Sequence, residues 1–193
     1  MDKMVGYQAT LWQNQFSYPQ SGFSMKFCPL CTHQLQQVVI EDVTRMACLQ
    51  PGCGFVHWNN PVPVVAALVR HEGNYILARN AQWPEQCYSV ITGYLEAGEA
   101  PDQAVVREVG EELGLVGHSL QQIGNYAFYD KNQVILAYHV QATGRIQINN
   151  ELAAVISLTP AELNDYDFGS FMLTRRIIDD WRQSVEQATG FSL

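Results

Sequence analysis

The sequence predicts a protein of the α/β class, in which a mixed β-sheet lies between helices and follows a small separate module. Two observations predict this fold. Beyond residue 60, short apolar runs typical of strands alternate with two longer patterns typical of amphipathic helices. Before residue 60, four of the five cysteines form two close pairs in a stretch too short to bury a core alone. Strands and helices in this order commonly form one sheet covered by helices.

The length of 193 residues accommodates one core of about 130 residues and a small module that needs a metal to fold. We therefore expect two folded units, the module over residues 26–60 and the main domain over residues 61–188. Residues 1–25 are expected to form a loosely ordered arm, and residues 189–193 a short tail. Met25 is an alternative first residue of the native chain.

The net charge of −8 is distributed unevenly along the chain. Residues 1–60 are neutral, because Lys3, Lys26 and Arg45 balance Asp2, Glu41 and Asp42. The whole negative excess therefore lies in residues 61–193. No basic stripe exists to neutralise phosphates, so extended nucleic-acid binding is not expected. No apolar stretch of roughly eighteen residues occurs, so no membrane span is indicated.

The cysteine pairs predict a zinc ribbon. Cys28 and Cys31 form one pair, and Cys48 and Cys53 form the other, after a spacer that can make a hairpin. Such spacing is typical of four thiolate ligands around a structural Zn²⁺. A disulfide framework is the alternative, but no secretory signal is present and Cys87 is left over. Reduced cysteines without targeting signals favour a cytoplasmic protein.

Alternating and apolar runs predict the elements of the main domain in order. Residues 63–70 and 75–79 read as a hairpin around a Glu-Gly-Asn turn. Residues 88–91 are expected to be a short strand that leads to Gly93. Further strands are expected at residues 120–128, 133–142 and 153–158. A last helix is expected over residues 174–187, with an apolar face of Ile177, Ile178, Trp181 and Val185.

Between these strands, the sequence predicts an acidic helix that binds a divalent metal. Pro101 suits the first turn of a helix, where its missing N–H costs nothing. Glu108, Glu111 and Glu112 then stand at i, i+3 and i+4 on one face. Like charges at this spacing destabilise a helix unless a cation binds them, and Mg²⁺ prefers such oxygen ligands. A stripe of Val105, Val109 and Leu113 is expected to pack in a core.

The segment around this helix resembles the Nudix box, G-x5-E-x7-R-E-U-x-E-E-x-G-U with U apolar. All nine specified positions are filled, by Gly93, Glu99, Arg107, Glu108, Val109, Glu111, Glu112, Gly114 and Leu115. A glutamate-rich surface helix, the alternative, does not also require the flanking glycines. The resemblance implies a Nudix hydrolase with an α/β/α sandwich over about residues 61–188. It also covers the ribbon, because a zinc-ribbon subgroup carries such a module before the catalytic domain.

Roles for the acidic residues follow from the chemistry of diphosphate hydrolysis, which needs charge neutralisation and a metal-activated water. Glu108, Glu111 and Glu112 are the candidate ligands of Mg²⁺ or Mn²⁺, and the resemblance implies the same catalytic set. We expect Arg107 to orient a neighbouring glutamate with its planar fork. Glu99 is expected to bind a further metal or to position a ligand. Gly93 is expected to let the backbone turn tightly, unless it is an ordinary loop glycine.

Glu151 follows a probable loop, where some Nudix enzymes supply a further glutamate as a base or metal ligand; a surface charge is the alternative. Tyr126, Phe128 and Tyr129 are candidates for stacking on a base such as adenine. Core packing is the alternative for at least one of them, because residues alternate across a strand.

The zinc-ribbon subgroup includes NADH pyrophosphatases and enzymes that act on ADP-ribose and FAD. Residues 88–94 are similar to the strand that enters the box in NADH pyrophosphatases. Their downstream S-Q-P-W-P-F-P-x-S array is absent, however, and residues 124–133 stand in its place. The proline that many ADP-ribose pyrophosphatases carry past the box is also missing, with Asp130 near that position. The sequence therefore leaves the preferred substrate open within this class.

We expect a metal-dependent pyrophosphohydrolase that splits the diphosphate of a nucleoside diphosphate linked to another moiety. The products are a nucleoside monophosphate and the phosphorylated partner, and NADH, NAD, FAD and ADP-ribose are the leading substrates. One alternative is an enzyme that removes modified nucleoside triphosphates. Another is a regulatory protein that only senses ADP-ribose or NAD. No sequence feature sets the oligomeric state, and a homodimer is an open alternative.

Overall fold

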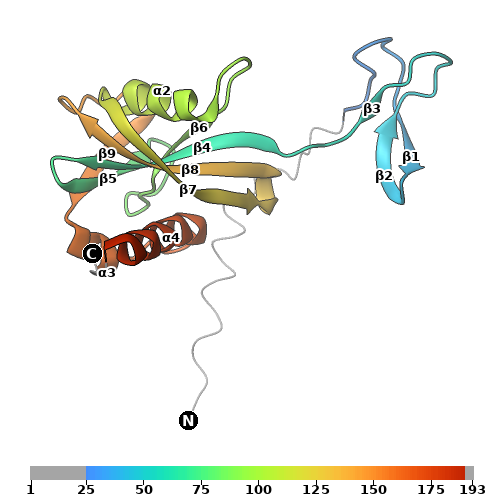
Figure 1. Ribbon diagram of the computed structural model, residues 1–193. Helices are drawn as coiled ribbons and strands as arrows, with labels where there is room; N and C mark the ends of the chain where they lie inside the picture. The colour runs from blue at the N-terminus through green and yellow to red at the C-terminus, as the bar shows by residue number, and fades with distance from the viewer. Residues whose placement is uncertain (1–24, 190–193) are drawn as a thin grey trace. The chain divides into compact units, whose positions relative to one another are not determined.

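The computed structural model describes residues 25–189 and divides them into two compact units (Figure 1). The boundary falls between Pro61 and Val62, with residues 130–132 grouped with the first unit. Residues 1–24 and 190–193 lie outside the described residues, and the expectations for the arm and for most of the tail fall there. In the part described, no helix is long and apolar enough to cross a membrane.

The first unit is a small antiparallel sheet of three strands, β1 (Gln36–Ile40), β2 (Val43–Ala47) and β3 (Val56–His57). Strands β1 and β2 form a hairpin whose turn residues, Glu41 and Asp42, both have positive φ. Two-residue turns of this kind match the twist of the flanking strands. The buried centre of this unit consists of Cys28, Leu35 and Cys48. Such a small core needs a further source of stability.

The second unit contains a mixed sheet of six strands. Their bounds are β4 (Val62–His71), β5 (Asn74–Asn80), β6 (Ile91–Tyr94), β7 (Val116–Phe128), β8 (Gln133–Thr143) and β9 (Leu152–Leu158). A short 3₁₀ turn, η1 (Tyr129–Lys131), connects β7 and β8. The strand order is β7-β8-β4-β5-β9, and β6 also pairs with β4. Strands β4 and β8 are parallel and the other pairs are antiparallel, which makes the sheet mixed.

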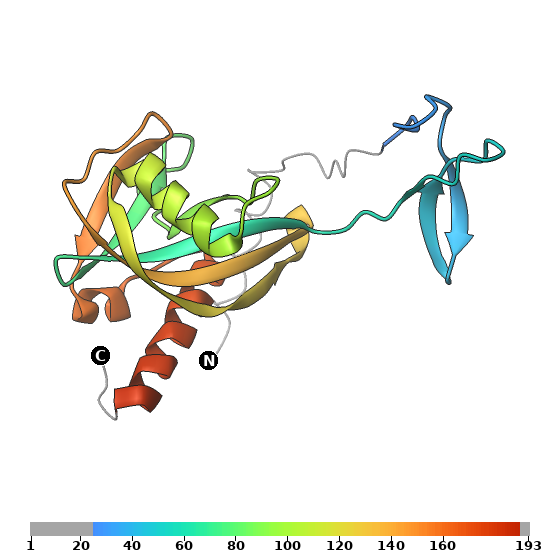
Figure 2. The same ribbon diagram turned by 45° about the horizontal axis from the view of Figure 1, so that its top comes forward.

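Helices cover both faces of this sheet (Figures 1 and 2). Helix α2 (Pro101–Leu113) lies on one face, while α3 (Pro160–Asp165) and α4 (Met172–Thr189) lie on the other. Successive residues of β4 point to opposite faces, so Leu68 packs toward α4 and Val69 toward α2. Because both faces are covered, β4 reads as a continuous apolar run in the sequence. The predicted α/β/α sandwich with a mixed sheet is confirmed.

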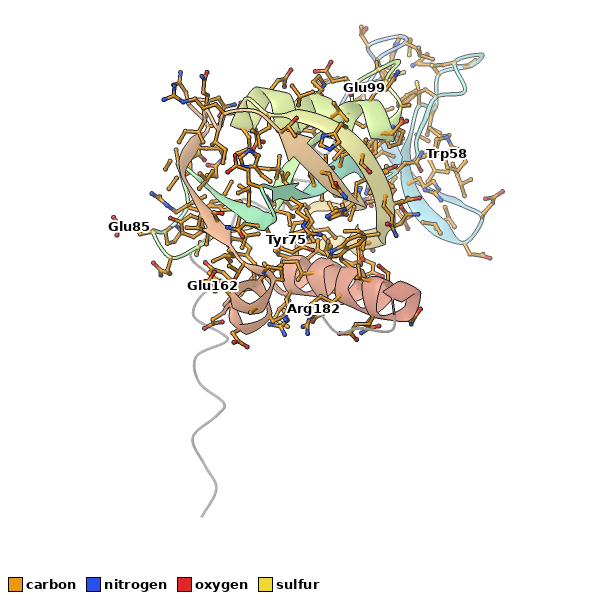
Figure 3. All side chains as sticks on the ribbon, turned by 60° about the vertical axis from the view of Figure 1, so that its left-hand side comes forward. Trp58, Tyr75, Glu85, Glu99, Glu162 and Arg182 are labelled. Carbon is orange, nitrogen blue, oxygen red and sulfur yellow. The ribbon has the colours of Figure 1, made fainter. Side chains whose placement is uncertain are left out.

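Helix α4 is anchored to the sheet by aromatic side chains. The indole N–H of Trp181 donates a hydrogen bond to the Tyr75 hydroxyl at 3.0 Å. The His139 ring of β8 stacks on Trp181, with ring centroids 4.0 Å apart. Figure 3 shows Tyr75 between the sheet and α4. The apolar face predicted for this helix is therefore the face that it buries, with Ile177 and Ile178 in the core.

Two elements differ from the sequence-based expectations. The strand expected at residues 88–91 lies later, because β6 begins at Ile91 and contains Gly93 itself. Ser89 instead forms an isolated bridge with Ala78. Helix α3 is not predicted, since six residues are too few for a periodic pattern. Thr159 caps it, accepting a hydrogen bond from the Glu162 backbone N–H while the Glu162 carboxylate accepts one from Thr159.

Candidate active site

Helix α2 carries Glu108, Glu111 and Glu112 on one turn, beside the apolar stripe that it packs against the sheet. Its apolar stripe of Val105, Val109 and Leu113 is fully buried, which fixes the rotation of the helix about its axis. Glu111 then extends toward solvent, with 57% of its side chain exposed. Glu112, one position further along, is 92% buried, with only 8% of its surface exposed. The three glutamates thus share one helical turn but have different surroundings.

Gly93 of β6 lies against the carboxylate of Glu108. A Cβ atom at residue 93 would overlap the carboxyl group of Glu108. Gly93 pairs with Val65 inside the sheet and does not have a positive φ. The expectation of a tight turn at Gly93 is therefore wrong, and close approach of the carboxylate explains why glycine occupies this position.

Arg107 is the centre of the hydrogen-bond network in the site. Its Nε and Nη2 atoms donate to the two carboxylate oxygens of Glu99, at 2.8 and 3.0 Å. Nη1 donates to Glu108 at 2.8 Å and to Glu111 at 3.1 Å. Nη2 also donates to the backbone carbonyl of Tyr94 at 3.1 Å. The planar fork therefore holds α2, β6 and the intervening loop together through one side chain.

Glu99 precedes α2 and is held by Arg107 on both oxygens, and one of them also accepts the backbone N–H of Glu96. Figure 3 shows Glu99 beside α2, on the other side of the sheet from Arg182 of α4. The guanidinium of Arg107 lowers the pKa of the Glu99 carboxyl. Of the two roles expected for Glu99, this geometry fits the positioning role.

Glu112 has an unfavourable electrostatic environment. Burial, followed by the charges of Glu108, Glu151 and Glu111, raises the pKa of Glu112 to about 8. Burial also raises the pKa of Glu108, although Arg107 opposes this shift. No residue within the described ranges donates a hydrogen bond to the Glu112 carboxylate. A buried carboxylate without donors and beside other carboxylates is stabilised most directly by a bound cation.

Glu151 lies near Glu112 in space, although the two are 39 positions apart in the sequence. Both side chains line one cavity, and the Glu151 charge contributes to the raised pKa values of Glu108 and Glu112. The backbone carbonyl of Glu151 accepts a hydrogen bond from the Ala81 N–H at 2.8 Å. The end of β5 therefore fixes the position of Glu151. The structure brings Glu151 to the acidic site, and its role as a base or metal ligand stays a prediction.

The same cavity has a volume of about 70 Å³ and includes two residues that the sequence analysis did not single out, Asn80 and Trp83. Asn80 is the last residue of β5, Trp83 lies in the connection that follows it, and neither belongs to a motif. An asparagine at a strand end and a tryptophan in the next connection give no periodic signal, so spacing alone could not identify them. Only the proximity of this loop to Glu112 and Glu151 makes them candidates.

The three aromatic residues proposed for stacking have different positions. Tyr126 is buried, with 4% of its surface exposed, and its hydroxyl donates to Asp180 of α4 at 2.8 Å. Tyr126 therefore packs in the core, the alternative given for at least one of them, and cannot offer a face to a base. Tyr129 is 89% exposed on η1, and Phe128 packs at the edge of the core. None of the three lines the cavity beside Glu112.

The four cysteines of the first unit form a compact cluster. All four Sγ atoms lie within 4.8 Å of one another, with Cys28 and Cys53 3.5 Å apart and Cys31 and Cys48 3.4 Å apart. A tetrahedral Zn²⁺ with Zn–S bonds of about 2.3 Å holds its sulfurs about 3.8 Å apart. All four are free thiols. The donor set and its spacing therefore fit a zinc ion.

The glutamates have the ligand atoms that a divalent metal prefers, although their oxygens are not gathered into a closed cluster. Within residues 25–189, the cysteines are the only group of three or more possible ligands whose atoms all lie within 4.8 Å. The glutamate oxygens are more widely spaced, because Arg107 holds Glu99, Glu108 and Glu111. The buried Glu112, with Glu108 and Glu151 nearby, offers the hard oxygen ligands that Mg²⁺ and Mn²⁺ prefer.

The fold and this acidic site define a Nudix protein. A family model described as NUDIX domain matches residues 60–177, so the chain belongs to the Nudix family. A solved Nudix hydrolase from Nitrosomonas europaea has the same fold, with a TM-score of 0.71 and 22% sequence identity. The alignment covers 87% of this chain and 95% of that protein. The resemblance noted in the sequence is confirmed, because the chain has the Nudix domain and its fold.

More specific relatives are proteins named NAD-capped RNA hydrolase NudC. The protein of this name from Stutzerimonas stutzeri is 31% identical over 144 residues, which cover 74% of this chain and 48% of the relative. The corresponding protein from Pseudomonas aeruginosa is 33% identical over 116 residues, covering 60% of this chain and 40% of the relative. The chain thus spans less than half the length of these curated relatives.

Proposed function

We propose that this chain is a metal-dependent pyrophosphohydrolase of dinucleotide-like substrates, with NADH, NAD, FAD and ADP-ribose as the leading candidates. The observation that carries this proposal is the Glu112 carboxylate, which is buried, lacks hydrogen-bond donors among the described residues, and lies beside Glu108 and Glu151. Such an arrangement loses free energy unless a cation neutralises it. Bound Mg²⁺ or Mn²⁺ supplies that charge, polarises the diphosphate and lowers the pKa of a bound water.

The chain's own residues position this chemistry. Glu108 and Glu112 bind the cation, and Glu111, on the exposed side of the same turn, offers a further ligand. Arg107 holds Glu99, Glu108 and Glu111 in place, so these carboxylates are ordered before substrate binds. Glu151, whose carboxylate has no hydrogen-bond partner within the described ranges, accepts the proton of the attacking water. The water oxygen bonds to one phosphorus while the bond from that phosphorus to the bridging oxygen breaks, and the products are a nucleoside monophosphate and the phosphorylated partner.

The cysteine cluster has a separate role in this proposal. Four thiolates complete a tetrahedral shell and leave no position for substrate, so a zinc ion there is structural. Its binding supplies the folding free energy that the small buried centre of the first unit lacks.

A second candidate substrate comes from the names of the relatives, which act on NAD-capped RNA. The bond in question is the same, because an NAD cap contains the diphosphate of NAD. The absence of a basic stripe in the sequence favours recognition of the cap over recognition of the RNA backbone. We therefore expect capped RNA, where it is a substrate, to be cleaved with little dependence on RNA length or sequence.

A product-resolved assay tests the proposal. Purified protein with Mg²⁺ or Mn²⁺ is incubated with NADH, NAD, FAD, ADP-ribose, NAD-capped RNA and modified nucleoside triphosphates, and the products are separated. We expect AMP from the dinucleotides and ADP-ribose. Release of inorganic pyrophosphate from triphosphates at clearly higher kcat/KM favours the alternative of an enzyme that removes modified nucleoside triphosphates. Tight binding of ADP-ribose or NAD without turnover favours the sensing alternative.

A further inference from the structure

The connection after β5 is fixed by hydrogen bonds at several points and does not form an open loop. The Trp83 backbone N–H donates to the Asn80 carbonyl at 2.9 Å, and Arg79 Nη1 donates to the Trp83 carbonyl at 3.2 Å. Ala81 is held by Glu151, as described above. The pairing of β5 with β9 shifts register between Arg79 and Asn80. A bulge at this point re-aims side chains, as bulges near functional sites commonly do.

Trp83 packs against an aromatic neighbour and also belongs to the lining of the acidic cavity. Its ring packs against Phe171, which precedes α4, with centroids 4.9 Å apart and an angle of 41° between the rings. Trp83 also lines the cavity that contains Glu112 and Glu151. A tryptophan that is supported from behind and borders the candidate cleavage site can hold a planar ring at low entropic cost, because its own rotamer is already fixed.

Asn80 adds a hydrogen-bonding group to the same cavity wall. Its side-chain oxygen accepts the backbone N–H of Gln82 at 2.9 Å, which fixes the amide orientation. The Nδ2 group has no hydrogen-bond partner among the residues that the structure describes. Two N–H donors are therefore without a partner on a residue that lines the cavity, whose other polar residues include Glu112 and Glu151.

We propose that Trp83 and Asn80 form the subsite for a heteroaromatic base of the substrate, with Trp83 stacking on the ring and Asn80 donating to its edge. The inference rests on the proposed function and moves base recognition from the strand and turn after Gly124 to the end of β5 and the connection that follows it. The cavity of about 70 Å³ is roughly half the volume that admits benzene in a protein core. The ring therefore lies on Trp83 at the opening of the cavity rather than inside it.

Adenine and nicotinamide share this chemistry, and equilibrium binding of the two halves of NAD separates them. The dissociation constants of AMP, nicotinamide mononucleotide and ribose 5-phosphate are measured by calorimetry for the wild type, Trp83→Ala and Trp83→Phe. We expect Trp83→Ala to weaken binding of one nucleotide by about tenfold or more, and Trp83→Phe by less than about threefold. Ribose 5-phosphate, which has no base, should bind all three proteins equally. The nucleotide that loses affinity identifies the base.

Trp58→Ala serves as the matched control, because Trp58 belongs to the first unit and packs against Arg45. The proposed subsite is wrong if Trp83→Ala binds both nucleotides with wild-type affinity. It is also wrong if Trp83→Ala loses as much affinity for ribose 5-phosphate as for the nucleotides, or if the wild type binds neither nucleotide. These outcomes are independent of hydrolysis. If the wild type hydrolyses NADH and Trp83→Ala has no effect on binding, the proposed function stands and the subsite is wrong. If binding depends on the base through Trp83 but no diphosphate is cleaved, the subsite stands and the proposed function is wrong.

Discussion

The Glu108 carboxylate of α2 lies directly against the Cα atom of Gly93 in β6, with no room for a side chain between them. This contact joins the helix that carries the glutamates to the sheet that supports it. It also explains why residue 93 is a glycine. A glycine in a central strand weakens the strand itself, so its presence points to the close approach of another group.

Gly93→Ala should reduce activity far more than stability. The added Cβ would overlap the end of the Glu108 side chain, which can swing away toward solvent without moving the backbone. We expect kcat for the preferred substrate to fall by about tenfold or more, with a change in melting temperature of less than about 4 °C. Steady-state kinetics and thermal unfolding measure the two effects.

Gly110→Ala is the matched control for that variant. Gly110 lies in α2 with a φ typical of a helix, and an added Cβ would meet only the Leu115 carbonyl oxygen at an ordinary 3.7 Å. Alanine at an exposed helix position is expected to stabilise by about 0.5–1 kcal/mol and to leave kcat unchanged. Equal kinetic effects of the two substitutions would show that close approach at Gly93 is not what the site requires.

Arg107→Lys should be damaging despite the retained positive charge. Arg107 makes five hydrogen bonds to four residues, including a bidentate pair with Glu99. An ammonium group has three donors and cannot reproduce the planar fork. We expect kcat to fall by about tenfold or more at saturating Mg²⁺. Arg175→Lys, which alters a half-exposed ion pair with Asp179 on α4, should retain activity. Near wild-type rates for Arg107→Lys would show that catalysis does not depend on the positioning of the glutamates by Arg107.

Local patterns predicted the fold and the acidic helix because each depends on neighbours in sequence. The apolar runs of β4 and α4 reflect burial, and the spacing of Glu108, Glu111 and Glu112 reflects one helical turn. The residues of the cavity wall could not be predicted from the sequence, because only the register of β5 against β9 places Asn80 and Trp83 beside Glu151. Tyr126 was ambiguous for a related reason: the sequence does not show which face of β7 meets α4.

The cysteine cluster predicts a metal content that is separate from the catalytic metal. Protein as purified should contain about one zinc ion per chain and remain inactive until Mg²⁺ or Mn²⁺ is added. Cys28→Ser should remove the zinc and increase hydrogen exchange in residues 25–61, with kcat affected only through stability. Cys87→Ser, which lies outside the cluster, should retain zinc. Elemental analysis measures the zinc content per chain. A folded, active protein with reduced cysteines and no zinc would refute the zinc-ribbon prediction.

His139 predicts an acid-sensitive step in stability. Burial, followed by the charge of Arg70, lowers the pKa of His139 from 6.5 to about 4 in the folded state. The folded state thus prefers neutral His139, so its contribution is fully present above the unfolded pKa of 6.5 and is lost as the pH falls toward 4. His139→Phe keeps a ring against Trp181 but cannot titrate. Between pH 7.5 and pH 5, the wild type should lose about 2 kcal/mol more unfolding free energy than His139→Phe. Parallel pH profiles from urea unfolding would contradict the shifted pKa.

The rate of AMP release by Glu112→Gln, compared with that of the wild type, tests the proposed metal-dependent hydrolysis most directly. Glutamine preserves the shape of the buried side chain but removes the charge that binds the cation. With NADH or ADP-ribose at saturating Mg²⁺, we expect the wild type to release AMP and Glu112→Gln to lose at least about a hundredfold in kcat, near 2.7 kcal/mol in barrier. The variant should unfold at or above the wild-type temperature, because a buried, unpaired carboxylate is gone. A loss of no more than about threefold, roughly 0.7 kcal/mol, would contradict the assignment of Glu112 to the catalytic metal site.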